Sequence, residues 1–255
     1  MLKIACEKRA KCISLDMNKD LKILQLGEVP YRKAFEQQLE LHAQRVEDRI
    51  PDTMLLLEHP HVYTLGRHAR EGNIVWSEAE RKARRVQVEH VDRGGDVTYH
   101  GPGQLVGYPL IKIAERGLTP RRLVEWVETL VIETLSRYGI KGYVHPDYPG
   151  VWVGDAKICA IGMRIRKGVS YHGFALNVST DLDYFNGIAP CGIRDKRVCS
   201  VNAVLGIHTD MERLAGNPLP ICAKHAAGNP GYLPEIVKKA FRFIENFCKL
   251  FSETH

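Results

Sequence analysis

The sequence lacks the features that mark membrane-spanning, secreted and nucleotide-binding proteins. No apolar run approaches the roughly 20 residues that a membrane helix needs, and the first residues alternate apolar and charged side chains instead of forming a signal peptide. Neither a GxxxxGK[ST] phosphate loop nor a Gly-x-Gly-x-x-Gly fingerprint occurs, so no motif argues for a bound nucleotide. We therefore expect a cytoplasmic protein with no membrane segment and no cofactor.

Cysteine is present, but its pattern excludes a disulfide framework. The seven cysteines are an odd number, scattered, and no two are spaced as Cys-x-x-Cys. Three histidines, His59, His61 and His68, lie close together, yet no cysteine or carboxylate joins them at a familiar ligand spacing. We expect no metal site, and most cysteines should be small buried side chains. The pattern leaves room for at least one reactive thiol.

The chain carries an excess of positive charge. Its 255 residues are 44% hydrophobic and 26% charged, which is ordinary for a globular protein, and the net charge is +6. Basic clusters lie at 81–85, 121–122 and 164–167. A solvated surface is the simpler interpretation of each cluster, and attraction of an acidic partner is the alternative, for which we select Arg121 and Arg122. No recognised nucleic-acid module accompanies the charge, so we expect no nucleic-acid partner.

The spacing of apolar residues predicts an α+β fold. Thr119 and Pro120 begin a helix that ends at Gly139. Two consecutive hairpins are predicted between 151 and 178, with turns at Gly154-Asp155 and near Gly168, and consecutive hairpins favour antiparallel pairing. Further helices are predicted after Pro30 and at 236–251, and further strands at 21–26, 54–59, 61–66, 86–91 and 105–111.

The most informative segment is the glycine-rich stretch from Arg93 to Gln104. Four glycines and a proline in twelve residues predict a turn-rich loop rather than a helix or an ordinary strand. Such a backbone lets amide groups approach a ligand closely, while polar side chains such as Thr98 and His100 orient the ligand. A long hairpin connection is the alternative interpretation. Strand-like residues directly after the loop favour a site.

Two side chains are candidates for nucleophilic chemistry. Cys191 lies between a proline and a glycine, a setting that leaves room for a ligand, whereas structural cysteines lie within periodic apolar runs, as Cys248 does. A thiol needs a cationic neighbour or a base to become a thiolate near neutral pH. Lys157 lies on a predicted strand among apolar residues, where a solvated lysine is less expected. Periodicity alone does not establish that the two side chains meet.

The glycine-rich stretch resembles the signature of a known family. The sequence is similar to the octanoyltransferases of lipoate biosynthesis, the LipB family of lipoyl(octanoyl) transferases, over roughly residues 22–205. The similarity rests on four motifs in the family's order: Arg93-Gly94-Gly95-x-x-Thr98-Tyr99-His100-x-x-Gly103-Gln104-x-Val106-x-Tyr108, Lys157-Ile158-Cys159-Ala160-Ile161-Gly162, Tyr171-His172-Gly173-Phe174-Ala175-Leu176-Asn177 and Pro190-Cys191-Gly192-Ile193.

The resemblance implies an enzyme, an acyltransferase that moves an octanoyl group from octanoyl-acyl carrier protein to a lysine. The acceptors would be lipoyl domains of 2-oxoacid dehydrogenase E2 subunits and the glycine cleavage H protein. It implies that Cys191 forms the acyl thioester and that Lys157 lowers the pKa of that thiol and shuttles protons. It also implies a substrate-binding set of Arg93, Gly94, Gly95, Asp96, Val97, Thr98, Tyr99, His100, Ala160, Ile161, Gly162, Gly173, Phe174 and Ala175.

The implied fold is of the biotin/lipoate protein ligase type, a mixed and largely antiparallel sheet flanked by helices. We expect a catalytic domain at 21–207, an N-terminal extension at 1–20, and a C-terminal loop and helix at 208–255 that pack on the same domain. Cys159 departs from the family pattern, because a small residue is expected there. Its strand setting suggests an inert second thiol.

Two other functions are compatible with the same motifs. An ATP-dependent lipoate or biotin protein ligase of this fold also uses a glycine-rich loop of this kind, but it needs ATP and does not need the Pro-Cys-Gly nucleophile. A non-catalytic acyl-binding scaffold is the third possibility, and the presence of both Cys191 and Lys157 argues against it.

Overall fold

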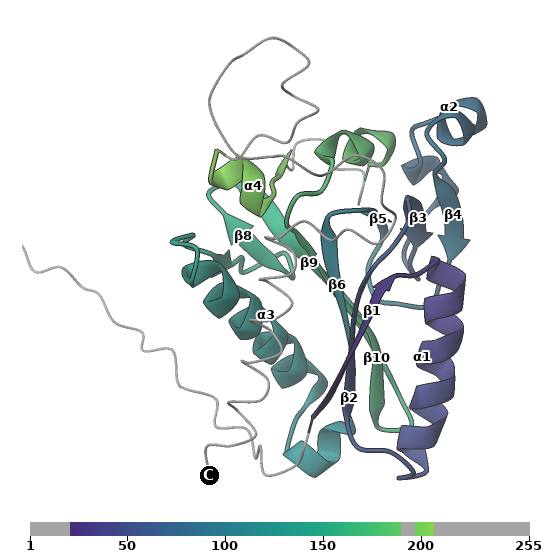
Figure 1. The fold of residues 1–255 in the computed structure, drawn as a ribbon, viewed down its shortest axis with the longest axis vertical. Helices are drawn as coiled ribbons and strands as arrows, with labels where there is room; N and C mark the ends of the chain where they lie inside the picture. The colour runs from purple at the N-terminus through teal and green to yellow at the C-terminus, as the bar shows by residue number, and fades with distance from the viewer. Residues whose placement is uncertain (1–20, 190–196, 207–255) are drawn as a thin grey trace, which may run out of the picture.

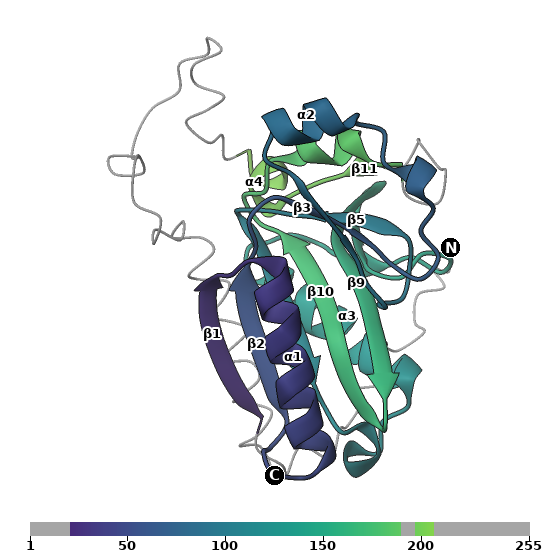
Figure 2. The same ribbon diagram turned by 90° about the vertical axis from the view of Figure 1, so that its right-hand side faces the viewer.

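A computed structural model describes residues 21–189 and 197–206, which form two β-sheets and their covering helices (Figures 1 and 2). The large sheet has the strand order β1-β2-β6-β10-β9-β8-β7, and β11 pairs with β9 off this path. These strands are β1 (Lys22–Glu28), β2 (Thr53–Glu58), β6 (Gln104–Leu110), β10 (Val169–Asn177), β9 (Ala156–Arg166), β8 (Val151–Val153), β7 (Tyr143–Val144) and β11 (Arg197–Val198). The small sheet has the order β4-β3-β5, with β4 (Gln87–His90), β3 (Val62–Leu65) and β5 (Val97–His100).

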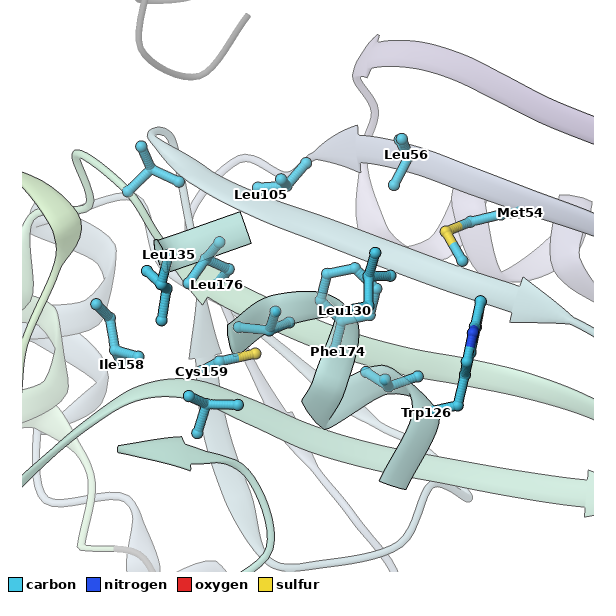
Figure 3. Close-up of a cluster of buried hydrophobic side chains, with 14 of the residues drawn as sticks. Met54, Leu56, Leu105, Trp126, Leu130, Leu135, Ile158, Cys159, Phe174 and Leu176 are labelled. Carbon is cyan, nitrogen blue, oxygen red and sulfur yellow. The ribbon is translucent and has the colours of Figure 1, made fainter. Parts of the chain in front are cut away.

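Two long helices cover opposite faces of the large sheet (Figure 2). Alternate residues of β2 point to opposite faces. Leu55 and Leu57 therefore pack under α1 (Tyr31–Val46), while Met54 and Leu56 join the core under α3 (Pro120–Ser136). Figure 3 shows this second core, where side chains of α3 meet those of β2, β6, β9 and β10. The remaining short helices are α2 (Glu78–Ala83), α4 (Val201–Val204), η1 (Glu71–Asn73), η2 (Ile113–Arg116) and η3 (Leu182–Gly187).

The predicted α+β class is confirmed, as are the principal elements. The Thr119 hydroxyl caps α3 by accepting a hydrogen bond from the Arg122 amide at 3.3 Å, as the Thr-Pro pair predicts. Both predicted hairpins form, with antiparallel pairs β8–β9 and β9–β10. The sheet is mixed because β1 pairs with β2, β3 with β4 and β9 with β11 in parallel.

The prediction of a continuous loop from Arg93 to Gln104 is wrong in its middle. Residues 97–100 form β5, which pairs antiparallel with β3. The sequence of β5 is Val-Thr-Tyr-His, which suits a strand, and the glycines lie only on either side of it. A further helix, α2, was not predicted, although the Ser77-x-x-Glu80 capping box that begins it is visible in the sequence.

Several predictions fall outside the residues that the structure describes. These are the N-terminal extension at 1–20, the helix at 236–251, the C-terminal segment at 208–255 and the nucleophile Cys191. Among the described residues, no helix is both long enough and apolar enough to cross a membrane.

Candidate active site

The three predicted substrate-binding segments meet on the large sheet. Gly173, Phe174 and Ala175 of β10 pair directly with Gly162, Ile161 and Ala160 of β9. The loop that carries Gly94 lies on these strands, since the Gly94 amide donates a hydrogen bond to the Met163 carbonyl at 3.4 Å. A Cβ atom on Gly162 would lie only 2.8 Å from the Gly94 carbonyl oxygen. The absence of a side chain at 162 is therefore what lets the loop backbone approach the strand.

Arg93 places a positive charge inside this site. Its side chain is buried, and its guanidinium donates to the hydroxyl and carbonyl oxygens of Thr64 at 2.7–3.1 Å and to the Gly94 carbonyl at 2.9 Å. Burial lowers the pKa of Arg93, but a guanidinium stays protonated in proteins. No carboxylate within residues 21–189 and 197–206 forms an ion pair with it. Arg93 is therefore a buried cation in the loop, a kind of group that can stabilise developing negative charge.

Other residues of the predicted binding set hold the loop in shape. The Asp96 carboxylate accepts hydrogen bonds from the Val97 amide and from the Asn73 side chain, each at 2.7 Å. The Tyr99 hydroxyl lies 2.8 Å from Nδ1 of His61, and burial raises the pKa of Tyr99. The Asp96 and Tyr99 side chains are thus hydrogen-bonded to other residues of the protein.

A chain of amide side chains connects His100 to the opposite edge of the site. His100 Nδ1 lies 2.8 Å from Oε1 of Gln104, whose Nε2 donates to Oδ1 of Asn177 at 2.9 Å. Asn177 in turn donates to the Cys199 carbonyl at 3.0 Å. Because the Gln104 oxygen can only accept a hydrogen bond, the ring proton of His100 lies on Nδ1. Burial lowers the pKa of His100 well below its usual value, so the ring is neutral at neutral pH.

Lys157 lies at the edge where the last described segment rejoins the sheet. It pairs with Trp152 of β8 on one side and with Val198 of β11 on the other, and its carbonyl accepts a hydrogen bond from the Cys199 amide at 3.0 Å. Its ammonium lies 5.0 Å from the centre of the Trp152 ring, within cation–π range. The polar residue that the sequence placed on a strand is thus a half-buried cation beside β11.

The two described thiols are poor nucleophiles. Cys159 is 1% exposed and lies in the core under α3 (Figure 3), and burial raises its pKa far above the usual range. Burial, with a contribution from Asp155, raises the pKa of Cys199 to about 11. Both are therefore thiols rather than thiolates at neutral pH. The histidines 59 and 61 are also engaged, since His59 uses both ring nitrogens on the Val29 carbonyl and the Tyr108 hydroxyl.

Sequence reasoning missed Asp92, the residue directly before the loop. Its carboxylate contacts Tyr171, His172 and Arg164. Burial lowers the pKa of His172 to about 4, so this ring is neutral. Burial alone would raise the pKa of Asp92, but the hydrogen bonds from His172 and Tyr171 outweigh it, so the pKa of Asp92 is lowered. The Tyr-His pair before Gly173 was visible in the sequence, but its partner lies in a different motif, and only the fold brings the two together.

Comparison with known proteins gives a consistent family. The model of the lipoyl protein ligase A/B catalytic domain matches residues 30–216. An octanoyltransferase of Alkaliphilus metalliredigens is 47% identical over 191 residues, which cover 74% of this chain and 88% of that protein. An octanoyltransferase of Rubrobacter xylanophilus is 50% identical, with 71% and 81% covered. One of Chloroflexus aggregans is 48% identical, with 76% and 90% covered.

Solved structures share the fold at low sequence identity. The structure of P. falciparum LipL1 in complex with lipoate superposes with a TM-score of 0.58 at 13% identity, covering 92% of this chain and 75% of that chain. A bi-partite lipoate protein ligase from Thermoplasma acidophilum gives a TM-score of 0.55 at 15% identity, covering 92% and 93%. These similarities confirm the predicted ligase-type fold. The family model and the relatives above show that the chain belongs to the octanoyltransferase family of acyltransferases.

Proposed function

We propose that this enzyme transfers an octanoyl group from octanoyl-acyl carrier protein to a lysine of a lipoyl-bearing protein. The acceptors would be the lipoyl domains of 2-oxoacid dehydrogenase E2 subunits and the glycine cleavage H protein. The observation that carries the proposal is the meeting of the Arg93–Gly95 loop with Ala160–Gly162 and Gly173–Ala175. The choice of octanoyl as the acyl group rests on relatives at 47–50% identity that are named octanoyltransferases.

In the first step, the Cys191 thiolate would attack the carbonyl carbon of the carrier thioester. A bond forms from Sγ to that carbon, the bond from carbon to the carrier's sulfur breaks, and the carrier leaves as a thiolate that takes up a proton. The tetrahedral intermediate bears a negative oxygen. Arg93 and the amides of its loop supply the nearby positive potential, and electrostatic stabilisation of this kind is often the largest single contribution to catalysis.

In the second step, the acceptor lysine would attack the octanoyl thioester of Cys191. A C–N bond forms, the C–S bond breaks, the amine loses a proton and the sulfur regains its thiolate. Lys157 is the proposed proton carrier and the cation that favours the thiolate, because it is half-buried at the edge formed by β8 and β11. A thioester donor already supplies the energy of the new bond, so the transfer would need no ATP.

The acylation step is tested by mass spectrometry without ATP. After incubation with octanoyl-carrier protein, the enzyme should gain one hydroxylamine-sensitive octanoyl group, and peptide mapping should place it on Cys191. Cys191→Ser should fold but not turn over, because an alkoxide is far harder to form than a thiolate. An adduct on Cys159 or Cys199 would overturn the assignment. A strict requirement for ATP would instead favour a ligase.

The role of Lys157 is tested by separating its charge from its proton transfer. Lys157→Ala should move alkylation of Cys191 by iodoacetamide to higher pH and slow both steps. Lys157→Arg keeps the charge but cannot accept a proton at ordinary pH, so it should acylate Cys191 in a single turnover yet transfer the octanoyl group at least about tenfold more slowly. If Lys157→Ala changes neither the alkylation profile nor turnover, the pairing of Cys191 with Lys157 is wrong.

A further inference from the structure

A single carboxylate at the start of the Arg93 loop is held by two consecutive residues of β10. The Tyr171 hydroxyl donates to Oδ2 of Asp92 at 2.7 Å, and Nε2 of His172 lies 2.8 Å from Oδ1. The two side chains thus contact different oxygens of the same carboxylate. Adjacent residues of an ordinary strand point to opposite faces, so two neighbours cannot both reach one group on one side.

The backbone of His172 resolves this conflict. Its φ is 54°, in the left-handed region that a side chain with a Cβ disfavours. The other three non-glycine residues at positive φ in the described chain, Asp48, Arg85 and Lys167, follow helices or form a hairpin turn, whereas His172 lies within a strand. Strain inside a regular element persists only where the surrounding structure enforces it, and it is characteristic of functional sites.

The surroundings of His172 do enforce it. Its amide donates to the Gln38 side chain at 2.9 Å, and its ring stacks on Phe35 with centres 5.2 Å apart, so α1 fixes both backbone and side chain. The side chain is 1% exposed. From the other side, Arg164 of β9 donates to Oδ2 of Asp92 at 2.5 Å. The Asp92 carboxylate is thus bonded to two adjacent strands and, through His172, braced against a helix.

This anchor lies beside the part of the loop that faces the site. Asp92 directly precedes Arg93, and the Gly94 amide bonds to Met163, which pairs with His172 across β9 and β10. Gly173, which directly follows His172, pairs with Gly162, against which the Gly94 carbonyl packs. Any movement of Asp92 would therefore move the loop backbone relative to both strands of the site.

We propose that Tyr171 and His172 are positioning residues that act through Asp92 to hold the Arg93–Gly95 loop in its acyl-binding position. The proposal rests on the octanoyl transfer proposed above for this site. Neither side chain takes part in the chemistry. Their loss would leave the nucleophile intact but weaken the binding of the acyl donor.

The test combines kinetics with amide hydrogen exchange on the full-length enzyme. Tyr171→Phe removes the hydroxyl that contacts Asp92 and keeps the ring. In His172→Asn the new residue can adopt the left-handed backbone, but its side chain is too short to replace the imidazole. Each should raise KM for the octanoyl donor about tenfold or more, the lower end of the effect expected from losing one charge-assisted hydrogen bond, with kcat within about twofold. Exchange at Gly94 and Gly95 should accelerate while the sheet amides stay protected.

Two comparisons separate positioning from general destabilisation. Tyr143→Phe, which removes a tyrosine hydroxyl bonded to the Gly154 carbonyl on the remote β7 edge, should change neither KM nor loop exchange. In an Asp92→Ala background, Tyr171→Phe should add little to KM, because the carboxylate that accepts the Tyr171 hydrogen bond is already gone.

Unchanged loop exchange in Tyr171→Phe and His172→Asn would overturn the anchor. Faster loop exchange with an unchanged KM would overturn its role in binding. If the parent enzyme accepts no octanoyl group at all, the proposed function fails, and the exchange measurement still decides whether Asp92 is held as proposed.

Discussion

At the scale of single residues, burial decides which side chains of the site carry charge. It lowers the pKa of His59 and of His172 to about 4 and that of His100 well below its usual value, so these imidazoles are neutral at neutral pH. Among the described residues, the basic side chains of Arg93, Lys157 and Arg164 lie in or beside the predicted substrate-binding segments. A fall in activity between pH 7 and 6 would therefore not arise from these three histidines.

Glu58 is the residue whose titration should be visible in stability. It accepts a hydrogen bond from the Gly103 amide at 2.5 Å, and burial raises its pKa to about 7 from 4.5. A raised folded-state pKa means that the folded protein binds the proton more tightly, so stability is lost as the pH rises from about 4.5 through 7. Glu58→Gln keeps an acceptor for Gly103 and removes this loss. The free energy of unfolding of this variant, measured in urea relative to that of the parent, should rise by up to about 3 kcal/mol from pH 5 to pH 8.

The exposed carboxylate Glu47 gives the matched control, because its side chain is 60% exposed. Glu47→Gln should show the same stability difference from the parent at both pH values. An equal difference at both pH values for Glu58→Gln as well would mean that Glu58 does not titrate in this range.

At the scale of elements, β9 organises the site. It carries Lys157 at one end, the Ala160–Gly162 segment in its middle and Arg164 further along, where that guanidinium reaches Asp92. Sequence patterns divided these residues between two hairpins, but the chain forms one strand of 11 residues shared by both. The residues proposed as proton carrier, acyl-binding backbone and loop anchor are therefore fixed relative to one another by the hydrogen bonds of a single strand.

Gly162→Ala tests this arrangement at the point where loop and strand touch. The added Cβ would lie 2.8 Å from the Gly94 carbonyl oxygen, which is closer than real Cβ contacts, so the Arg93 loop must shift. We expect KM for the octanoyl donor to rise at least about tenfold, with a destabilisation of about 1–3 kcal/mol as for other overpacking changes. Donor kinetics and urea unfolding measure the two effects.

Gly72 provides the control for that substitution. A Cβ there meets nothing within 4 Å, and its φ is not in the left-handed region, so Gly72→Ala should leave both KM and stability close to those of the parent. Normal kinetics in a folded Gly162→Ala enzyme would show that the contact between loop and strand does not matter for binding.

At the scale of the whole molecule, the large sheet has a site end and a structural end. The loop contacts lie beside Gly173, whereas the Lys167-Gly168 turn packs against η2, just before α3 begins (Figure 1). Four residue steps along β10 separate Val169, which pairs with Lys112, from Gly173, about 13 Å at about 3.3 Å per residue. Arg121 and Arg122 belong to the structural end, and Arg121 is paired with Glu125. This basic cluster is the one selected from sequence for an acidic partner, and that selection stays a prediction.

Asp52 tests the independence of the two ends. Its buried carboxylate binds Arg45 at 2.7 Å, contacts Arg116 and accepts from the Lys112 amide at 3.0 Å. Asp52→Asn removes the charge that two buried guanidinium groups share, and removing one partner of a buried pair costs about 3–5 kcal/mol. The midpoint of urea unfolding should fall accordingly, while KM and kcat at a temperature where the variant is folded should stay within about twofold. A comparable loss of activity in the folded variant would show that the ends are coupled.

The sequence by itself determined the family, the α+β class, the long helices and the hairpins, because these depend on local patterns. The Thr119 cap and the alternation of apolar residues along β2 act over only a few residues. The glycines at 94 and 162 act directly on the backbone, because they carry no side chain. It also identified Lys157 as an unusual lysine, and the proposed partner of this lysine, Cys191, lies outside the described residues.

Only the tertiary structure decided how the loop is held and which groups are charged. Whether an imidazole is neutral depends on how deeply the fold buries it, and no spacing in the sequence measures burial. The strand β5 within the glycine-rich stretch forms because β3 lies beside it. Asp92 and His172 are far apart in sequence and meet because β10 turns two adjacent side chains to one side. That conformation is disfavoured locally, so only contacts from α1 and β9 across the fold could select it.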